Sequence, residues 1–262
     1  MFSNGLKPKK SLGQNFLMHA QTASRIVHVA EISSETTVLE IGPGTGMLTR
    51  ELLKSAGKVI AVEADFSLRE KLEETFAEDI TSERLSLFFQ DIRSFDTETL
   101  PKEYVLVANI PYYITGEIIR MFLTAPNPPK SMTLLVQKEV AVRIARSEKE
   151  SLLSLSVKIF GTPHYRFTVP SGAFIPRPKV DSAVLSITDI SNPFENREEE
   201  ALFFELLRAG FAHKRKMLRS NLESLYKREL ILDAFTSENL SPQVRPEELS
   251  LSDWVKLFKK LS

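Results

Sequence analysis

The chain has 262 residues, of which 42% are hydrophobic and 26% charged, values typical of one large α/β domain or of that domain with a small partner domain. Lysine and arginine together number 34, and so do aspartate and glutamate, so an RNA-binding surface would have to be a local patch. The absence of cysteine excludes disulfides, thiolate zinc sites and cysteine nucleophiles.

The first ten residues are basic, with Lys7, Lys9 and Lys10, and they lack the apolar stretch of a signal peptide. No apolar run elsewhere approaches the length of a membrane span. We therefore expect a cytoplasmic protein.

Strand-like and helical segments alternate after a first helix, which is expected at Ala20–Glu31. The expected strands are Thr37–Ile41, Val59–Val62, Leu85–Phe89, Tyr104–Ala108 and Ser131–Val136. The expected helices are Met47–Lys54, Phe66–Phe76, Gly116–Leu123 and Glu139–Ala145. Strands that are apolar on both faces and alternate with helices predict an α/β fold with a mostly parallel sheet covered on both sides.

The rest of the chain changes in character at Asn192-Pro193. Before it, further strands are expected at Leu153–Phe160, Tyr165–Val169 and Ala183–Ile187, and their short connections predict that some are antiparallel. After it, only helices are expected, at Glu198–Ala212, Lys214–Tyr226, Arg228–Ser237 and Ser252–Leu261. The sequence thus predicts two domains, residues 1–190 and a small all-helical domain of residues 191–262.

A glycine-rich turn follows the first strand, with the sequence Glu40-Ile41-Gly42-Pro43-Gly44-Thr45-Gly46. Glycines permit a tight turn and let the backbone approach a ligand closely. A dinucleotide-binding loop would need a further glycine where the chain has Met47 or Thr49, so a pyrophosphate site is not expected. The spacing resembles the first motif of class I methyltransferases, whose ligand ends in an amino acid.

Acidic residues follow the second and third strands. Glu63 ends the second strand about twenty residues beyond the glycines, where a carboxylate can accept hydrogen bonds from both hydroxyls of a ribose. Asp65 is expected to cap the helix that follows. Asp91, after the third strand, can accept from the adenine amino group of the ligand, and Ile92 can pack on the ring. The carboxyl ends of strands are where open α/β sheets bind ligands.

The fourth strand ends in Asn109-Ile110-Pro111-Tyr112-Tyr113, which resembles the N-x-P-Y motif of amino-methyltransferases acting on adenine or cytosine. The lone pair of adenine N6 is delocalised into the ring. The Asn109 side-chain oxygen and the Ile110 carbonyl can accept its two N–H bonds and favour a more reactive, pyramidal nitrogen. Pro111 fixes its own φ and helps hold that carbonyl in place. Tyr112 can stack on a target base that is unpaired or flipped out.

Two further segments are similar to signatures of the ribosomal RNA adenine dimethylases. One is Ser11-Leu12-Gly13-Gln14-Asn15-Phe16-Leu17, and the other runs from Phe174-Ile175-Pro176-Arg177-Pro178 to Val184. With the motifs above, the chain resembles the small-subunit adenine N6,N6-dimethyltransferases from about Lys7 to Ile187. The resemblance implies a Rossmann-like class I methyltransferase fold with S-adenosylmethionine as methyl donor.

The resemblance also implies roles for single residues. The cofactor-binding residues would be Asn15, Leu17, Gly42, Gly44, Glu63, Asp91 and Asn109. The catalytic residues would be Asn109, Tyr112 and Phe174, with Phe174 as the wall of the base pocket opposite Tyr112. The expected partner is 16S-type small-subunit ribosomal RNA within an immature small subunit. The expected reaction is the N6-dimethylation of two adjacent adenosines in its 3′-terminal hairpin loop, by a monomeric enzyme.

A basic stretch in the helical region is the candidate RNA-binding surface. It carries Lys214, Arg215, Lys216 and Arg219, in a segment of Arg208–Arg228 whose only acidic residue is Glu223. Such a run can follow phosphates, although a solvated charged face is equally common. The four histidines are scattered without ligand spacing, so no metal is expected.

Three alternatives stay open from the sequence. The first is the sister group that methylates an adenine of large-subunit ribosomal RNA, which shares the N-x-P-Y core. The second is a non-catalytic RNA-binding assembly or transcription factor that kept the fold, against which the intact Asn109 and Tyr112 argue. The third is DNA adenine methylation, for which no target-recognition domain is recognisable.

Overall fold

The computed structural model describes residues 8–9 and 12–262, which form two compact units. The first unit comprises the residues up to Ala141 together with Thr162–Ile190, and the second comprises Val142–Gly161 together with Ser191–Ser262. The predicted division between residues 190 and 191 places residues 142–161 in the first domain, whereas in the structure they belong to the second unit. The reason is aromatic packing, since Phe160 stacks on Phe204 with ring centroids 6.0 Å apart.

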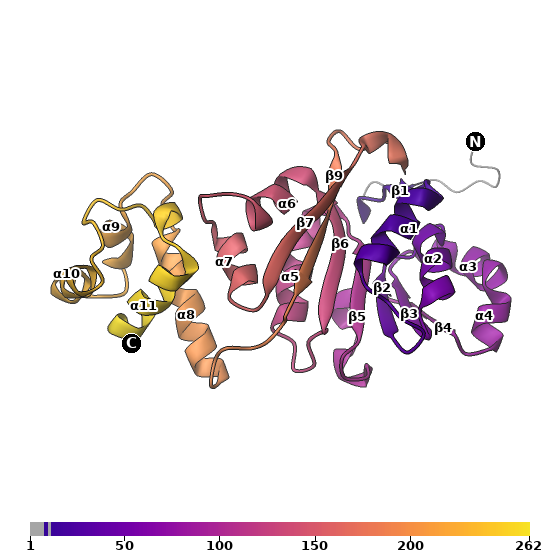
Figure 1. Cartoon of the computed structure of the whole chain (residues 1–262), viewed down its shortest axis with the longest axis horizontal. Coiled ribbons are helices and arrows are strands. Elements are labelled where there is room, and N and C mark those ends of the chain that lie inside the picture. The colour runs from indigo at the N-terminus through magenta and orange to yellow at the C-terminus, as the bar shows by residue number, and fades with distance from the viewer. Residues whose placement is uncertain (1–7, 10–11) are drawn as a thin grey trace. The chain divides into compact units, whose positions relative to one another are not determined.

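A seven-stranded sheet forms the centre of the first unit (Figure 1). Its strands are β2 (Thr37–Ile41), β3 (Lys58–Glu63), β4 (Leu85–Phe89), β5 (Val105–Asn109), β6 (Ser131–Gln137), β7 (Thr162–Val169) and β9 (Ser182–Thr188). They lie in the order β4-β3-β2-β5-β6-β9-β7, and β9 is antiparallel to both of its neighbours. This is the mixed, mostly parallel sheet that the sequence predicts. The chain moves outward from β2 to β4 and then returns to place β5 beside β2, which makes a topological switch point between β2 and β5.

Helices cover the sheet and close a hydrophobic core. The helices of the first unit are α1 (Ala20–Val29), α2 (Met47–Ser55), α3 (Arg69–Thr75), α4 (Ala77–Thr81) and α5 (Thr115–Leu123), and α6 (Lys138–Ala145) crosses its boundary. Apolar side chains of α1, α2 and α3 join one cluster with the strand residues Val38, Val59 and Val107. The predicted helix Phe66–Phe76 is divided into a 3-10 turn at Phe66–Leu68 and α3.

A separate two-stranded ribbon joins the N-terminal segment to a loop that follows β7. In it, β1 (Phe16–Leu17) pairs antiparallel with β8 (Phe174–Ile175). This pairing connects two segments that are more than 150 residues apart in the sequence and fixes the C-terminal end of the described N-terminal segment.

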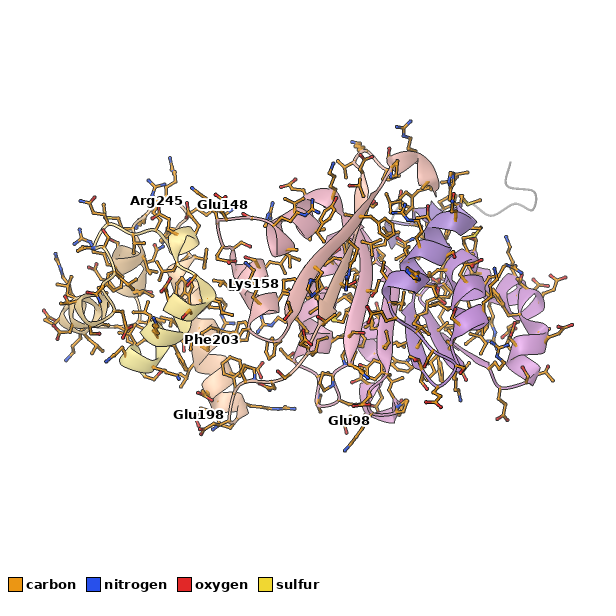
Figure 2. All side chains as sticks on the ribbon, in the orientation of Figure 1. Glu98, Glu148, Lys158, Glu198, Phe203 and Arg245 are labelled. Carbon is orange, nitrogen blue, oxygen red and sulfur yellow. The ribbon has the colours of Figure 1, made fainter. Side chains whose placement is uncertain are left out.

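The second unit is helical, with α7 (Leu152–Lys158), α8 (Arg197–Gly210), α9 (Leu218–Leu222), α10 (Arg228–Ser237) and α11 (Leu251–Leu261). Lys158 of α7 pairs with Glu150, and Phe203 of α8 packs edge-on against Phe258 of α11 with ring centroids 5.4 Å apart. Figure 2 labels Lys158 and Phe203. Within the described part of the chain, no helix is long and apolar enough to cross a membrane.

Two predicted elements in this region are wrong. The segment Leu153–Phe160 forms the helix α7 instead of a strand, and Ser151 and Ser154 close a reciprocal capping box at its start. The predicted helix Lys214–Tyr226 is reduced to the five residues of α9, because residues 211–217 form a turn. The side chain of Asn221 fastens this turn by donating to the carbonyls of Gly210 and His213.

Candidate active site

A cavity opens at the switch point, where the carboxyl ends of β2, β3, β4 and β5 meet. It contains about 900 Å³ of space free of protein atoms, part of which is open solvent. Strand ends, the glycine turn and the segment Leu12–Phe16 line it. The cavity brings together seven of the predicted residues, Asn15, Gly42, Gly44, Glu63, Asp91, Asn109 and Tyr112.

Two predicted residues, Leu17 and Phe174, do not line this cavity. They are partners in the β1–β8 ribbon, and both are buried in the hydrophobic core, with 3% and 2% of their surfaces exposed. Leu17 lies against a smaller adjacent hollow that it shares with Gly42, Gly44 and Asn109. The role of Phe174 as a wall opposite Tyr112 stays a prediction, and in this geometry it would require the Phe174 ring to move.

The glycine turn has a left-handed backbone at both cavity glycines, with φ of 70° at Gly42 and 59° at Gly44. A Cβ at Gly44 would lie 2.9 Å from Cδ1 of Phe16, so this glycine is needed for contact with the N-terminal segment. The expected reason, close approach of a ligand, applies better to Gly42. A Cβ there would meet only the Asn109 carbonyl oxygen, at 3.9 Å.

Glu63 ends β3 with its side chain buried against the glycine turn. Its Oε2 accepts from the backbone N–H of Gly44 at 3.0 Å, and its Oε1 accepts from the backbone N–H of Asp65 at 2.8 Å. Burial raises the pKa of Glu63 in spite of these two donors. Each carboxylate oxygen has two lone pairs, so both can accept a further hydrogen bond from a ligand hydroxyl.

Asp91 follows β4 and is engaged by Arg93. The Arg93 guanidinium donates from Nε to Oδ1 at 2.9 Å and from Nη2 to Oδ2 at 2.5 Å. These hydrogen bonds hold the pKa of the Asp91 carboxyl below its usual range. A ligand amino group would have to share this carboxylate with Arg93, which also lines the cavity and lies 3.8 Å from Glu117. The sequence alone predicts no role for Arg93.

Asn109 ends β5 and contacts the N-terminal segment across the cavity. Its Nδ2 donates to the backbone carbonyl of Asn15 at 3.0 Å. Because the amide nitrogen is used in this way, Oδ1 is the acceptor that remains for a ligand. Three residues further on, Tyr112 is half-buried, and its hydroxyl lies 2.7 Å from the Ser182 hydroxyl of β9. Burial raises the pKa of Tyr112, so the hydroxyl is neutral near neutral pH.

Two buried carboxylates near the cavity, Asp65 and Glu40, have surroundings that the sequence did not predict. Asp65 caps the 3-10 turn Phe66–Leu68 as predicted, by accepting from the Ser67 N–H, but it also accepts from the N-terminal segment. Glu40 on β2 is 1% exposed, and neither of its carboxylate oxygens has a hydrogen-bond partner within the described residues. Burial raises its pKa to about 8; the Thr49 side chain opposes this effect, and the neighbouring Glu63 carboxylate adds to it.

The candidate RNA-binding residues lie in the second unit, three of them between α8 and α9 and Arg219 in the first turn of α9. Lys214, Arg215 and Lys216 are exposed, Arg219 is partly exposed, and none of the four forms an ion pair within the part of the chain that the structure describes. We call these four residues the basic turn. Its charges are free to contact solvent or an anionic partner.

Comparison with solved structures identifies the class of protein that this fold and cavity define. The 23S rRNA methyltransferase ErmE superposes with a TM-score of 0.76 at 26% identity, covering 94% of this chain and 99% of that one. A dimethyladenosine transferase from Plasmodium falciparum superposes with a TM-score of 0.80 at 27% identity, covering 92% and 95%. The protein is an S-adenosylmethionine-dependent methyltransferase of the Rossmann-like class.

The chain belongs to the ribosomal RNA adenine dimethylase family, which matches residues 5–262. Similar proteins include the ribosomal RNA small subunit methyltransferase A of Dehalococcoides mccartyi, 40% identical over 96% of this chain and 88% of that protein. The protein of the same name from Bacillus pumilus is 36% identical over 98% of this chain and 92% of that protein.

Proposed function

We propose that the chain transfers methyl groups to the N6 amines of two adjacent adenosines in the 3′-terminal hairpin loop of small-subunit ribosomal RNA. The observation that carries this proposal is the Asn109 amide at the end of β5, whose Nδ2 is bound to Asn15 and whose Oδ1 is left for an amine. The small-subunit substrate is supported by the names of relatives that are 40% and 36% identical over nearly the whole chain. The large-subunit enzyme ErmE is less similar, at 26% identity.

The residues of the cavity fit S-adenosylmethionine. Glu63 would accept from the ribose hydroxyls, since its two oxygens each keep a free lone pair beside the backbone donors. Asp91 would accept from the adenine amine alongside Arg93, and the apolar side chain of Ile92 lines the cavity next to it. Gly42 would leave room for the methionine portion, because almost no protein atom occupies the position of its missing Cβ.

When bound, S-adenosylmethionine supplies a methyl group that is already activated on a sulfonium, so the chain itself mainly has to orient the amine. Asn109 Oδ1 and the Ile110 carbonyl would accept its two N–H bonds and favour the pyramidal nitrogen that attacks. Catalysis of this kind depends on positioning and on preorganised acceptors more than on a general base.

Tyr112 would hold the target base by stacking. Its hydroxyl is bound to Ser182, which restricts the ring to one orientation beside Asn109. The base must leave its stack to reach this position, and that is least costly for an unpaired loop nucleotide. Phe174 would supply the opposite wall after leaving its buried position in the β8 ribbon.

The second unit would bind ribosomal RNA through the basic turn, since exposed Lys and Arg side chains without intramolecular partners are available to phosphates. The enzyme would act as a monomer on an immature small subunit in the cytoplasm.

Methyl transfer from radiolabelled S-adenosylmethionine to purified immature small subunits, followed by nucleoside analysis, tests the proposed function. We expect label in N6,N6-dimethyladenosine from two adjacent positions near the 3′ end of the small-subunit RNA. Purified large-subunit RNA and a DNA duplex serve as parallel substrates. Label that enters large-subunit RNA or DNA instead would contradict the assignment, and no label in any substrate would favour a non-catalytic factor.

A further inference from the structure

The described N-terminal segment crosses the cavity as a separate piece of chain. Leu12–Phe16 line the cavity, although the strand ends around them come from residues 41–114. The β1–β8 pairing holds one end of this segment. The other end is held by a single buried side chain, that of Asp65.

Asp65 is 2% exposed, and its carboxylate accepts from two residues of the segment. Lys9 Nζ donates to Oδ1 at 2.6 Å, and Gln14 Nε2 donates to Oδ2 at 2.8 Å. Ser67 donates to Oδ1 from both its backbone N–H and its hydroxyl. A buried carboxylate is costly unless charges and hydrogen bonds compensate it, so docking of Lys9 and Gln14 is coupled to the burial of Asp65.

The Gln14 side chain links Asp65 to the backbone of the segment, and we call this pair of contacts the anchor. Its Oε1 accepts from the Lys9 backbone N–H at 2.7 Å while its Nε2 binds Asp65, so both ends of the amide are used. The next residue, Asn15, presents the carbonyl that accepts from Asn109 Nδ2 at 3.0 Å. A shift of Gln14 therefore moves the group that determines which way the Asn109 amide faces.

We propose that Asp65 is a positioning residue for methyl transfer, which holds Gln14 so that the Asn15 carbonyl fixes Asn109 with Oδ1 toward the target amine. The inference rests on the proposed function, because it takes Asn109 as the acceptor for that amine. Asp65 touches neither the amine nor the methyl donor, and its effect passes through the N-terminal segment. Loss of the anchor would leave the Asn109 amide free to rotate and to present its nitrogen to the amine.

Exchanging the two polar partners tests the anchor. Gln14→Glu places two carboxylates together. Asp65→Asn leaves one acceptor oxygen, and the Lys9 and Ser67 donors hold that oxygen on their side, so the new amide nitrogen faces Gln14 Nε2. Each single variant therefore disrupts the contact. The double variant, Gln14→Glu with Asp65→Asn, restores one carboxylate opposite one amide. Ser67→Ala is the matched control, because it removes a hydrogen bond to the same carboxylate without touching the segment.

The measurement is the single-turnover rate of methyl transfer at saturating cofactor and RNA, with cofactor affinity measured separately by calorimetry. We expect each single variant to be at least about tenfold slower, the double variant to return to within about threefold of wild type, and Ser67→Ala to stay near wild type. A double variant as slow as the product of the two single losses would overturn the proposal. So would single variants at the wild-type rate, or an equal loss in Ser67→Ala.

The wild-type chain in the same assay separates this inference from the proposed function. No methylation of adenine by wild type would remove the proposed function itself. Full wild-type activity with unaffected anchor variants would remove only the role of Asp65.

Discussion

Replacing Glu40 with Gln should change how the stability of the chain depends on pH. Burial raises the pKa of this carboxyl from its ordinary value of 4.5 to about 8, with a further contribution from Glu63. Between these two values the folded chain keeps a proton that the unfolded chain has released. The wild-type free energy of unfolding should therefore fall by about 1.4 kcal/mol per pH unit from this group alone.

The sign follows from the raised pKa. The favourable contribution of protonated Glu40 is fully present below about pH 4.5, is lost as the pH rises towards 8, and changes no further above that value. Glutamine keeps the size of the side chain and cannot ionise. The stability of Glu40→Gln relative to wild type should therefore increase with pH and reach a difference on the order of 5 kcal/mol.

Denaturant unfolding followed by circular dichroism, at several pH values between 5 and 9, measures this difference. Glu98→Gln is the control, because it makes the same exchange at an exposed glutamate of the first unit. Parallel pH curves for wild type and Glu40→Gln would refute the reasoning, since they would mean that the buried carboxyl does not hold its proton.

Three further predictions concern ligand binding. Gly42→Ala should weaken S-adenosylmethionine binding in calorimetry, because the added methyl group would occupy space that the ligand needs. Both glycines have a positive φ, so either alanine lowers thermal stability; Gly44→Ala should lower it more, because its Cβ would also contact the Phe16 ring, and the opposite order would contradict these assignments. Glu63→Ala should weaken cofactor binding by about 1–3 kcal/mol, the cost of losing hydrogen bonds to a charged acceptor, and a larger calorimetric effect of Asp65→Ala would show that the wrong carboxylate was chosen. Replacing the three consecutive lysine and arginine residues of the basic turn with Ala should reduce the salt dependence of RNA binding, whereas an unchanged slope would mean that these charges contact only solvent.

The sequence predicts the sheet and most of the cavity for a physical reason. Val105–Ala108 of β5 is a continuous apolar run, as expected of a buried parallel strand, and the residues that end or follow such strands meet at one edge of the sheet. The positions of Glu63, Asp91 and Asn109 at strand ends therefore predict that they lie close together, and all three line one cavity.

The alternation of residues in α7 explains why that element was predicted wrongly. Leu153, Leu155 and Val157 alternate with Ser154, Ser156 and Lys158, which has the period of a strand. In the helix, Ser154 is fully buried at no cost in hydrogen bonding, because it takes part in the capping box and donates to Glu150. A buried serine that completes a cap cannot be distinguished by pattern from a serine on the polar face of a strand.

Contacts over long sequence separations account for what the sequence could not predict at the site. The bonds from Lys9 and Gln14 to Asp65 connect residues more than 50 positions apart, and the bond from Asn109 to Asn15 spans 94. Local propensity contains no information about such pairs. The hydrogen bonds from Arg93 to Asp91 join residues only two positions apart. An Asp-x-Arg sequence is nevertheless equally compatible with an exposed arginine that has no partner.

The central claim is that Asn109 orients the target amine through Oδ1, and single-turnover methylation by Asn109→Ala tests it most directly. The variant should fold, bind cofactor and RNA appreciably, and transfer methyl groups at least about a hundredfold more slowly, a loss typical of removing one preorganised polar group. Saturating RNA and cofactor separate this chemical defect from a binding defect. A near-normal single-turnover rate in Asn109→Ala would contradict the account, even with the family assignment unchanged.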